Sequence, residues 1–540
     1  MFKAPIELLD QTKVKTVSDN CANDLQLKEV YNDLLEKTSS DSNSLTQLRK
    51  TWLSTFTTDT TYLKETQRLL SQNKNPISTV NTEQIKGIID ELRTNPSFRE
   101  KYEYITVDYF EHLNKNEYVL HLISLYSLIS PVVSLITPFI MMIIPFFILS
   151  VRGTSISFST YMTQLKQVFI MLPLGKLFDL GSASWDQRGF ILFSVIIYLV
   201  QIYQNTLTCY RFYKNSSKMV KELHQIADYC DETVNTMEQF LQMTSDYESY
   251  TPFNQNLEGK IQSLKETSGQ FRKIREGAFK NMGQRMRAYY DVFCDENLHQ
   301  LLEYTFSFHE YMMNISNLSI LQENGLLKAC RFSKSKFSFK NLYHPLLRFQ
   351  NPVKNSLRLT KTNMILSGPN ASGKTTLIKS MMVNLILAQQ IGMGFYDKAQ
   401  IIPHDFIHCY INIPDTSDRD SLFQAEARRC KEIITTIDKN KQAKHLCVFD
   451  ELFSGTNPYE AVASATGYLR YLNSRANVRY MLTTHYIELC EKFIDQNFTF
   501  EKKYSLSQGI TKIRGGIKVL EELEFPESIV TTAKELVSLN

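Results

Sequence analysis

The sequence lacks paired cysteines, and its charge has no dominant sign. Its nine cysteines are scattered, their number is odd, and none stands in a Cys-x-x-Cys pair. This pattern argues against a structural zinc site and a disulfide framework, and it fits a reducing compartment. Sixty basic and 56 acidic side chains leave a formal charge of +4. So small an excess excludes a global attraction to nucleic acid or anionic lipid, and any such contact must come from a local patch.

Charged residues are absent from two long stretches of the chain. No Asp, Glu, Lys or Arg occurs from Tyr118 to Val151 or from Gly189 to Tyr210. Because a bilayer core needs about 20 predominantly apolar helical residues, we expect two membrane spans, at about 118–151 and 189–210. Prolines in the first stretch favour one bent span or a re-entrant pair. The alternative is two buried helices in a soluble core, and the basic residues between the stretches do not decide the orientation.

The length predicts several domains. With 540 residues and 43% hydrophobic content, the chain can bury more than one core. We predict a polar helical N-terminal region at 1–117, a membrane region at 118–210, a helical lever region at 211–335 and an ATPase domain at 336–540. The N-terminus has early acidic residues and no apolar h-region, so we expect no cleaved secretory signal.

Two helical patterns outside the apolar stretches carry specific expectations. Leu63, Leu69 and Leu70 have the spacing of an amphipathic helix. In the lever region, the basic run FRKIREGAFKNMGQRMRAYY could lie along a phosphate backbone or acidic lipid. A solvated helix face explains such a run better.

The strongest chemical signal is MILSGPNASGKTTLIKS. A short apolar strand leads into Gly368-x-x-x-x-Gly373-Lys374-Thr375 and then into a helical pattern, which is the context of a phosphate-binding P-loop. Backbone N–H groups and the positive end of the helix meet the phosphates, Lys374 reaches the terminal ones, and the Thr375 hydroxyl ligates Mg²⁺. We therefore predict an α/β P-loop NTPase domain that binds ATP and Mg²⁺, preceded by a mostly α-helical lever region with transmembrane helices.

Acidic and histidine side chains follow two further apolar strands. Asp450 and Glu451 end the segment that starts at Leu446, which is the Walker B arrangement: one carboxylate joins the magnesium shell and the next orients or deprotonates the attacking water. His485 follows the segment from Tyr480, where a histidine at the carboxyl edge of a parallel sheet could hydrogen-bond the γ-phosphate. Alone, an acidic pair is usually solvated surface and a histidine usually structural, but their place downstream of a P-loop favours function.

At these residues the chain resembles the MutS family of DNA mismatch-repair ATPases. GPNASGKTT, SLFQAEA, VFDELFSGTN and TTHYIEL stand in the family's order and approximate spacing, and YHPLL and NPVKNSL precede them. The resemblance runs from about residue 301 to the end, where GITKIRGGIKVLEELEFPESIVTTAKEL looks like the family's closing β-hairpin and helix. The resemblance implies an ATPase of the ABC/MutS type that works as a homodimer and has double-stranded or branched DNA as its partner.

The resemblance also implies roles for individual residues. Asn370 and Lys374 would contact phosphate, and Thr375 and Asp450 would hold Mg²⁺. Glu451 would activate water, helped by Lys374 and by His485 as a sensor of the γ-phosphate. The predicted nucleotide-binding loop is Gly368, Pro369, Asn370, Ala371, Ser372, Gly373, Lys374, Thr375 and Thr376.

The resemblance also bears on three residues outside the nucleotide-binding loop. Ser421, which opens SLFQAEA, matches the residue offered across the dimer to the other subunit's nucleotide. Asn355 lies in the segment that passes beside the base, whereas His344 is expected to be structural.

The departures from the family pattern bear on function. Gly-Lys-Thr replaces Gly-Lys-Ser, and Phe453-Ser454-Gly455-Thr456 replaces Gly-Arg-Gly-Thr, neither of which threatens hydrolysis. The mismatch-recognition domain with its Phe-x-Glu wedge has no counterpart before the apolar stretches, and Phe308-His309-Glu310 is expected to be packing. No His-Asn-His nuclease signature follows the ATPase motifs.

Three functions follow as hypotheses. The first is a MutS-like ATPase whose dimer closes as a clamp on DNA, as in mismatch repair. In this hypothesis the chain is tethered to a membrane, and its ATPase domain faces the cytoplasm or its equivalent, because ATP is there. The second is half of an ABC transporter, for which two or three spans are too few and no Leu-Ser-Gly-Gly-Gln signature appears. The third is a membrane scaffold in which ATP controls assembly with protein partners and DNA plays no part.

Overall fold

A computed structural model describes residues 2–35, 47–72, 80, 82–151, 157–172, 174–181, 184–275, 281–359, 363–369, 372–411, 413, 422–502, 505–510, 520 and 523–538. The chain divides into two compact units. Unit 1 consists of Met1–Thr79, Thr236–Gly259 and Tyr304–Asn540, and unit 2 consists of Val80–Asn235 and Lys260–Glu303. The beginning of the chain therefore folds with its C-terminal part, and both apolar stretches lie in unit 2.

The centre of unit 1 is a six-stranded sheet with the order β10-β11-β12-β7-β13-β14. The strands from β10 to β13 run parallel, and β14 pairs antiparallel with β13. The strands are β7 (Met364–Ser367), β10 (Phe406–Tyr410), β11 (His445–Asp450), β12 (Val478–Thr484), β13 (Asn497–Lys502) and β14 (Ser505–Gln508). The register places Asp450 opposite Thr483 and Thr484 opposite Ser367, so β11, β12 and β7 end together at one edge of the sheet.

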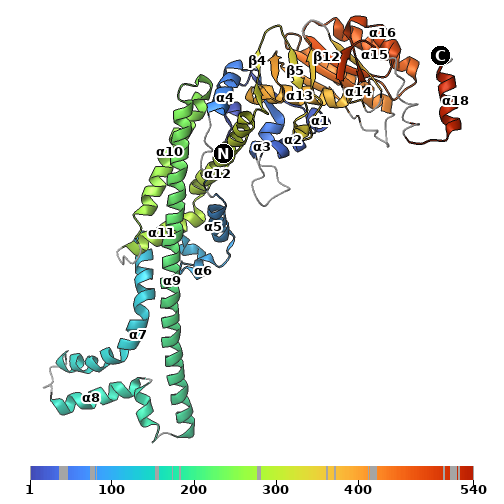
Figure 1. The fold of residues 1–540 in the computed structure, drawn as a ribbon. Helices are drawn as coiled ribbons and strands as arrows, with labels where there is room; N and C mark the ends of the chain where they lie inside the picture. The colour runs from blue at the N-terminus through green and yellow to red at the C-terminus, as the bar shows by residue number, and fades with distance from the viewer. Residues whose placement is uncertain are drawn as a thin grey trace. The chain divides into compact units, whose positions relative to one another are not determined.

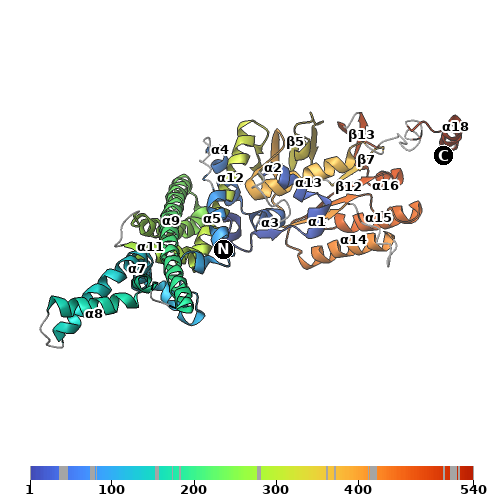
Figure 2. The same ribbon diagram turned by 90° about the horizontal axis from the view of Figure 1, so that it is seen from below.

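Helices cover both faces of this sheet (Figure 2). Helices α14 (Leu422–Lys439) and α15 (Pro458–Asn473) share a buried apolar cluster with Phe449 and Leu482 of the sheet. Helix α13 (Lys374–Ile391) lies on the other face. Because side chains alternate between the two faces of a strand, burial on both sides explains why β7, β11 and β12 are almost continuously apolar. The structure confirms an α/β C-terminal part.

Helix α13 is buried on almost every side. It is flanked by Gly373 before its first residue and Gly392 after its last. The φ angles of these two glycines, 94° and 74°, lie in the left-handed region that glycine adopts without strain. Gln390 Nε2 donates to the carbonyl oxygen of Trp52 at 2.6 Å, and Gln389 Nε2 donates to that of Thr57 at 3.2 Å. The N-terminal segment therefore completes the core around α13.

This N-terminal segment is a short helical layer with one small hairpin. Its elements are η1 (Pro5–Leu8), β1 (Val14–Thr16), α1 (Asp19–Asp24), α2 (Leu27–Leu34), α3 (Gln47–Ser54), β2 (Thr55–Thr57) and α4 (Thr60–Gln72). Strands β1 and β2 pair antiparallel. Leu63, Leu69 and Leu70 are all buried in α4, which confirms the predicted amphipathic helix.

The remaining elements of unit 1 surround the main sheet. A four-stranded sheet has the order β4-β9-β5-β6, and β3 pairs with β8. The strands are β3 (Lys328–Ala329), β4 (Arg331–Phe332), β5 (Ser338–Leu342), β6 (Asn355–Arg358), β8 (Met393–Gly394) and β9 (Lys398–Ile401). The short helices are η4 (Glu248–Tyr250), η6 (Pro345–Leu347), α16 (Ile487–Glu491), η7 (Ile494–Gln496) and α18 (Glu527–Ser538). Helix α18 agrees with the predicted closing helix, whereas much of the predicted closing hairpin falls outside the described residues.

Unit 2 is helical among its described residues. It holds α5 (Thr82–Thr94), α6 (Phe98–Lys101), η2 (Asp108–Lys115), α7 (Glu117–Val151), α8 (Phe158–Met171), η3 (Gly175–Asp179) and α11 (Met282–Cys294). Helices α9 (Trp185–Thr244), α10 (Thr251–Arg272) and α12 (Glu296–Glu323) contribute residues to both units. The predicted lever region is helical, and the helices that run through it are long, since α9 has 60 residues and α12 has 28.

The apolar stretches form the paired helices α7 and α9, which run side by side (Figure 1). Asn205 Nδ2 donates to Ser134 Oγ at 2.6 Å, and Tyr198 Oη donates to the Ser134 carbonyl oxygen at 3.1 Å. Helix α7 then bends and continues beside α8 (Figure 1), and its internal prolines account for a bend of this kind.

Two helices, Glu117–Thr137 and Trp185–Thr244, are long and apolar enough to cross a membrane, judged by length and composition alone. Only 22% and 11% of the residues in their most apolar windows are buried. Within the described part of the chain these apolar side chains are therefore mostly exposed, which two buried core helices would not be.

Candidate functional site

Polar side chains converge where β7, β12 and β11 end. Strand β12 lies between the other two, and all three are parallel. The loop after β7, the histidine after β12 and the acidic pair at the end of β11 therefore meet at one edge of the sheet, as the carboxyl ends of parallel strands do in α/β proteins.

Lys374 lies in the first turn of α13 and points back into the loop after β7. Its Nζ donates to the carbonyl oxygens of Gly368 and Pro369, each at 2.9 Å, and lies 3.4 Å from His485 Nε2. Burial lowers the pKa of Lys374, and the carboxylate of Glu451 partly offsets this effect. The lysine therefore brings a cation close to both the loop and the acidic pair.

A hydroxyl and a carboxylate meet beside the lysine. Thr375 Oγ1 donates to Asp450 Oδ2 at 2.8 Å, and Thr483 Oγ1 donates to Asp450 Oδ1. Asp450 is thus held by a threonine on each side, one from α13 and one from β12. A threonine hydroxyl and an aspartate are the hard oxygen donors that Mg²⁺ prefers.

Glu451 pairs with His485 across the strand ends. Glu451 Oε1 lies 2.6 Å from His485 Nε2, and their side chains are 42% and 36% exposed, so water can reach the pair. The hydrogen bond from His485 lowers the pKa of Glu451, with a further contribution from the charge of Lys374, while burial opposes both. Glu451 is therefore an ionised carboxylate at neutral pH, with a histidine as its hydrogen-bond partner.

The backbone that carries Glu451 is strained. Glu451 and Phe453 have φ angles of 56° and 59°, a left-handed conformation that costs a non-glycine residue about 1–3 kcal/mol. The Glu451 N–H donates to the carbonyl oxygen of Thr483 at 3.1 Å, and the Phe453 N–H donates to Tyr410 Oη at 3.4 Å. Contacts from two neighbouring strands therefore hold the loop in this shape.

The residues present fit a nucleoside triphosphate with Mg²⁺. Ser372 Oγ, in the loop, is buried and has no hydrogen-bond partner among the described residues, and such an atom calls for a polar group beside it. The Thr375–Asp450 pair offers oxygen ligands of the kind that Mg²⁺ takes together with substrate phosphates. In the described part of the chain, no cluster of three or more His, Cys, Asp or Glu side chains offers a different kind of metal site.

The structure brings together most of the predicted site residues that it describes. Lys374, Thr375, Asp450, Glu451 and His485 form the cluster above, and Gly368, Pro369, Ser372 and Gly373 form the described part of the loop. Thr376 follows in the first turn of α13. Asn370, Ala371 and Ser421 lie outside the described residues.

Asn355 is engaged away from the loop. It opens β6, and its Oδ1 accepts a hydrogen bond from the Leu506 N–H of β14 at 3.0 Å. This contact ties the smaller sheet to the edge of the main sheet, while a role beside a nucleotide base stays a prediction.

Two residues predicted to be structural are structural. His344 is buried and its ring accepts a hydrogen bond from the Leu346 N–H at 3.4 Å, which caps η6, and burial lowers its pKa to about 4. Phe308 is fully buried in α12, where its ring packs against Phe240. The Phe308-His309-Glu310 triplet therefore serves packing, as expected.

Two residues of the site were missed by the sequence analysis. Thr483 is the partner of Asp450, and its signal was only its place at the end of a predicted strand. Glu426 lies in the motif SLFQAEA, and its carboxylate accepts hydrogen bonds from the loop after Glu451.

Three of the four arginines of the basic run, Arg272, Arg285 and Arg287, are engaged within unit 2, whereas Arg275 is exposed. Arg272 pairs with Asp231 at 2.8 Å and with Asp228 at 2.6 Å. Arg285 is buried, and it donates to Ser216 Oγ and to the carbonyl oxygen of Arg275 at 2.7 Å. Residues 276–280 of the run fall outside the described residues.

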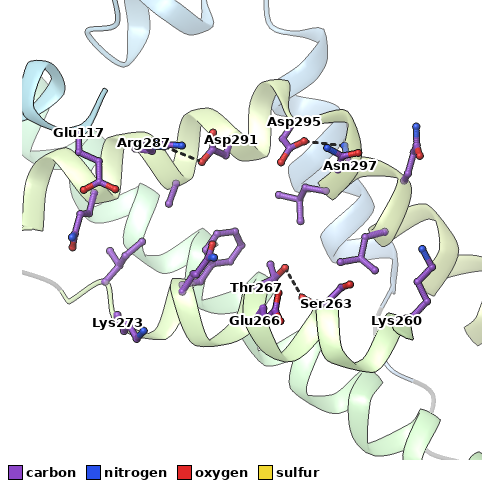
Figure 3. Close-up of a pocket in the computed structure, with 18 residues that line it drawn as sticks. Glu117, Lys260, Ser263, Glu266, Thr267, Lys273, Arg287, Asp291, Asp295 and Asn297 are labelled. Atoms are coloured by element: carbon purple, nitrogen blue, oxygen red, sulfur yellow. Dashed lines mark hydrogen bonds and ion pairs between the residues drawn. The ribbon is translucent and has the colours of Figure 1, made fainter. Parts of the chain in front are cut away.

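A groove of about 750 Å³ lies beside this run (Figure 3). Its lining mixes both signs of charge: Glu117, Lys260, Glu266, Lys273, Arg287, Asp291 and Asp295. Arg287 pairs with Asp291 at 3.6 Å (Figure 3). A phosphate backbone needs a surface with one positive sign, so this groove favours the interpretation of the run as a folded, solvated helix face.

The fold and the cluster of side chains define the C-terminal part as an α/β domain of the class that binds ligands at the carboxyl ends of its parallel strands. A family model described as MutS domain V matches residues 364–539. The chain is 28% identical over 264 residues to endonuclease MutS2 of Finegoldia magna, and this alignment covers 46% of the chain and 32% of the relative. It is 29% identical over 211 residues to endonuclease MutS2 of Lactococcus lactis subsp. cremoris, which covers 36% and 26%. The chain thus spans less than a third of the length of these relatives, and its match to the MutS family model lies in this C-terminal part.

Proposed function

We propose that this chain is a Mg²⁺-dependent ATPase of the MutS type. The observation that carries the proposal is the convergence of Lys374, Thr375, Asp450, Glu451 and His485 at one sheet edge. Bound Mg²⁺ would neutralise charge on the phosphates. The experiment is a measurement of phosphate release from ATP by the purified chain with Mg²⁺ and after chelation.

Each of these side chains then has a defined role in hydrolysis. Lys374 would bind the terminal phosphates, and Thr375 and Asp450 would hold Mg²⁺ through oxygen atoms. Glu451 orients a water molecule and accepts its proton, because an ionised carboxylate within hydrogen-bond reach of water serves as a general base. His485 Nε2 lies beside both Glu451 and Lys374; it holds the carboxylate in place in the free chain and would turn its N–H to the γ-phosphate when nucleotide binds.

The proposal extends to a homodimer on DNA. Ser421 in SLFQAEA would complete the partner's nucleotide site, and closure of the dimer would clamp double-stranded or branched DNA. The matched relatives are named endonucleases. We propose ATP hydrolysis for this chain, because the region matched by the family model holds Lys374, Thr375, Asp450, Glu451 and His485.

DNA is expected to raise the ATPase rate. The detergent-solubilised chain would be assayed alone and with duplex, mismatched and branched DNA, at low and at high salt, because contacts to phosphates weaken as salt rises. A several-fold increase at low salt that disappears at high salt would support the clamp. An equal rate with every DNA would remove DNA from the proposal.

One observation favours a second function, a membrane scaffold whose assembly with protein partners is controlled by ATP. Arg272 and Arg287 of the basic run are paired with acidic groups and Arg285 is buried, which leaves Lys273 and Arg275 as exposed basic side chains in its described part. Two such residues make a shorter positive strip than DNA binding requires. The DNA assay separates the two functions, because the scaffold predicts no response to DNA.

We also propose that α7 and α9 tether the chain to a membrane, with the ATPase domain facing the cytoplasm or its equivalent. Support comes from the uncharged stretches, the exposure of their apolar side chains and the hydrogen bonds between the two helices. In hydrocarbon, polar groups that meet across a helix pair avoid the cost of an unsatisfied hydrogen bond.

The wild-type chain is expected to stay in the membrane pellet after carbonate extraction. Ile196→Arg combined with Leu199→Arg should release a large fraction to the supernatant, because each arginine at a span centre costs roughly 2.5–3.5 kcal/mol; both side chains are more than half exposed on α9. Asn235→Arg, an exposed site further along the same helix, serves as the control and should leave the pellet fraction unchanged. Complete extraction of the wild-type chain would contradict the tether.

A further inference from the structure

Helix α14 reaches the loop after the acidic pair through one buried carboxylate. Glu426 is 2% exposed, and a glutamate is almost never buried to this degree unless its charge is satisfied. Its Oε1 accepts from the Ser454 N–H at 3.1 Å and from Ser454 Oγ at 2.9 Å, and its Oε2 accepts from the Gly455 N–H at 3.2 Å. All three donors belong to the segment that begins at Glu451.

The loop approaches α14 so closely that only glycine fits at position 455. A Cβ atom built on Gly455 would lie 2.8 Å from Leu422 Cγ and 2.8 Å from the Phe423 nitrogen, at the start of α14. The end of the loop and the first turns of the helix are therefore in direct contact, and neither can shift alone.

The other end of this connection is the strained backbone at Glu451 and Phe453. A conformation of this kind persists only where surrounding contacts hold it. Strand β12 holds Glu451, Tyr410 holds Phe453, and Glu426 holds the two residues that follow.

Helix α14 is also held by contacts with strand β10 and helix α1. Arg429 donates to the carbonyl oxygen of Cys409 at 3.0 Å and pairs with Asp24 of α1 at 3.4 Å. The carboxylate of Glu426 therefore connects a helix that is fixed by β10 and α1 to the loop that carries Glu451.

We infer that Glu426 is a positioning residue, which couples the placement of α14 to the orientation of the Glu451 carboxylate. The inference rests on the proposed ATPase function and adds a means of regulation, because any partner that moves the start of α14 also moves Glu451. Glu426 acts through Glu451 and contacts no phosphate.

The test compares single and double variants in single-turnover ATP hydrolysis. Glu426→Gln keeps the shape of the side chain but turns an NH₂ group toward a backbone N–H donor, so we expect kcat to fall at least tenfold while the Kd for ATP stays within about twofold. Glu432→Gln, at an exposed site on the same helix, is the matched control and should leave kcat unchanged. Ser454→Ala removes one of the three hydrogen bonds and should lower kcat by a smaller factor.

The decisive readout is the effect of Glu426→Gln in a Glu451→Gln background. If Glu426 acts through Glu451, the second substitution has no further effect on turnover. An equal loss of kcat in both backgrounds, or an unchanged kcat in the single variant, would overturn the positioning role. A wild-type chain that does not hydrolyse ATP would overturn the proposed function itself, which distinguishes the two failures.

Discussion

Replacing Glu451 by glutamine is expected to slow ATP hydrolysis by roughly 10²–10⁴-fold, the usual contribution of a positioned general base. Glutamine keeps the size of the side chain and its hydrogen bond with His485 but cannot accept a proton from water. The Kd for ATP should stay within about threefold of the wild-type value, because Lys374 and Thr375 remain in place. The measurement is single-turnover hydrolysis together with equilibrium binding of a fluorescent ATP analogue.

Glu488→Gln provides the control, because Glu488 is an exposed glutamate three residues beyond His485. Its turnover should match that of the wild type. The hydrogen bond from His485 keeps the pKa of Glu451 low, so the wild-type carboxylate is ionised above the ordinary glutamate pKa of about 4.3. Acid should therefore not reduce kcat through Glu451 until the pH falls below that value. Similar rates in the wild type and in Glu451→Gln would show that another group activates the water.

Replacing Lys374 by alanine is expected to weaken ATP binding itself. A hydrogen bond to a charged group contributes about 1.5–3 kcal/mol, so loss of the lysine should raise the Kd for ATP by roughly 10–100-fold. Hydrolysis at subsaturating ATP should fall by at least that factor. Isothermal titration calorimetry with ATP and Mg²⁺ measures the effect on binding separately from turnover.

The matched control for this substitution is Lys379→Ala on the same helix. Lys379 Nζ donates to Gln26 Oε1 at 3.0 Å and takes no part in the loop contacts. Its removal should leave ATP affinity within about twofold. An ATP affinity that survives in Lys374→Ala would place the phosphates away from the loop after β7.

The parts of the fold that could be predicted from the sequence are those with a strong local pattern. Short apolar runs before a glycine-rich loop, an acidic pair and a histidine identified β7, β11 and β12 and the residues at their ends. The parallel arrangement then followed from the chemistry, because these groups can meet only if the three strands end at the same edge.

The rest depends on contacts between residues far apart in the chain. Nothing near Glu426 in the sequence indicates that its side chain accepts hydrogen bonds from the loop after Glu451. Likewise, nothing near Thr483 indicates that its hydroxyl donates to the carboxylate of Asp450. The pairing of Arg272 with Asp228 and Asp231 was equally hidden, so the basic run alone could not distinguish a folded face from a phosphate-binding strip. The membrane tether, the dimer and DNA binding stay predictions.

Helix α13 has a consequence for how the protein can be divided. Its two glutamines bond the backbone of residues 52–57, and Gly392 at its end faces the Leu63 carbonyl oxygen, which lies 2.5 Å from where a Cβ would be. Starting the chain at residue 336 would remove these acceptors and leave one side of an apolar helix in water. The segment that carries the ATPase motifs is therefore not expected to fold alone. It needs the first seventy or so residues of the chain, which belong to the same compact unit, to cover helix α13.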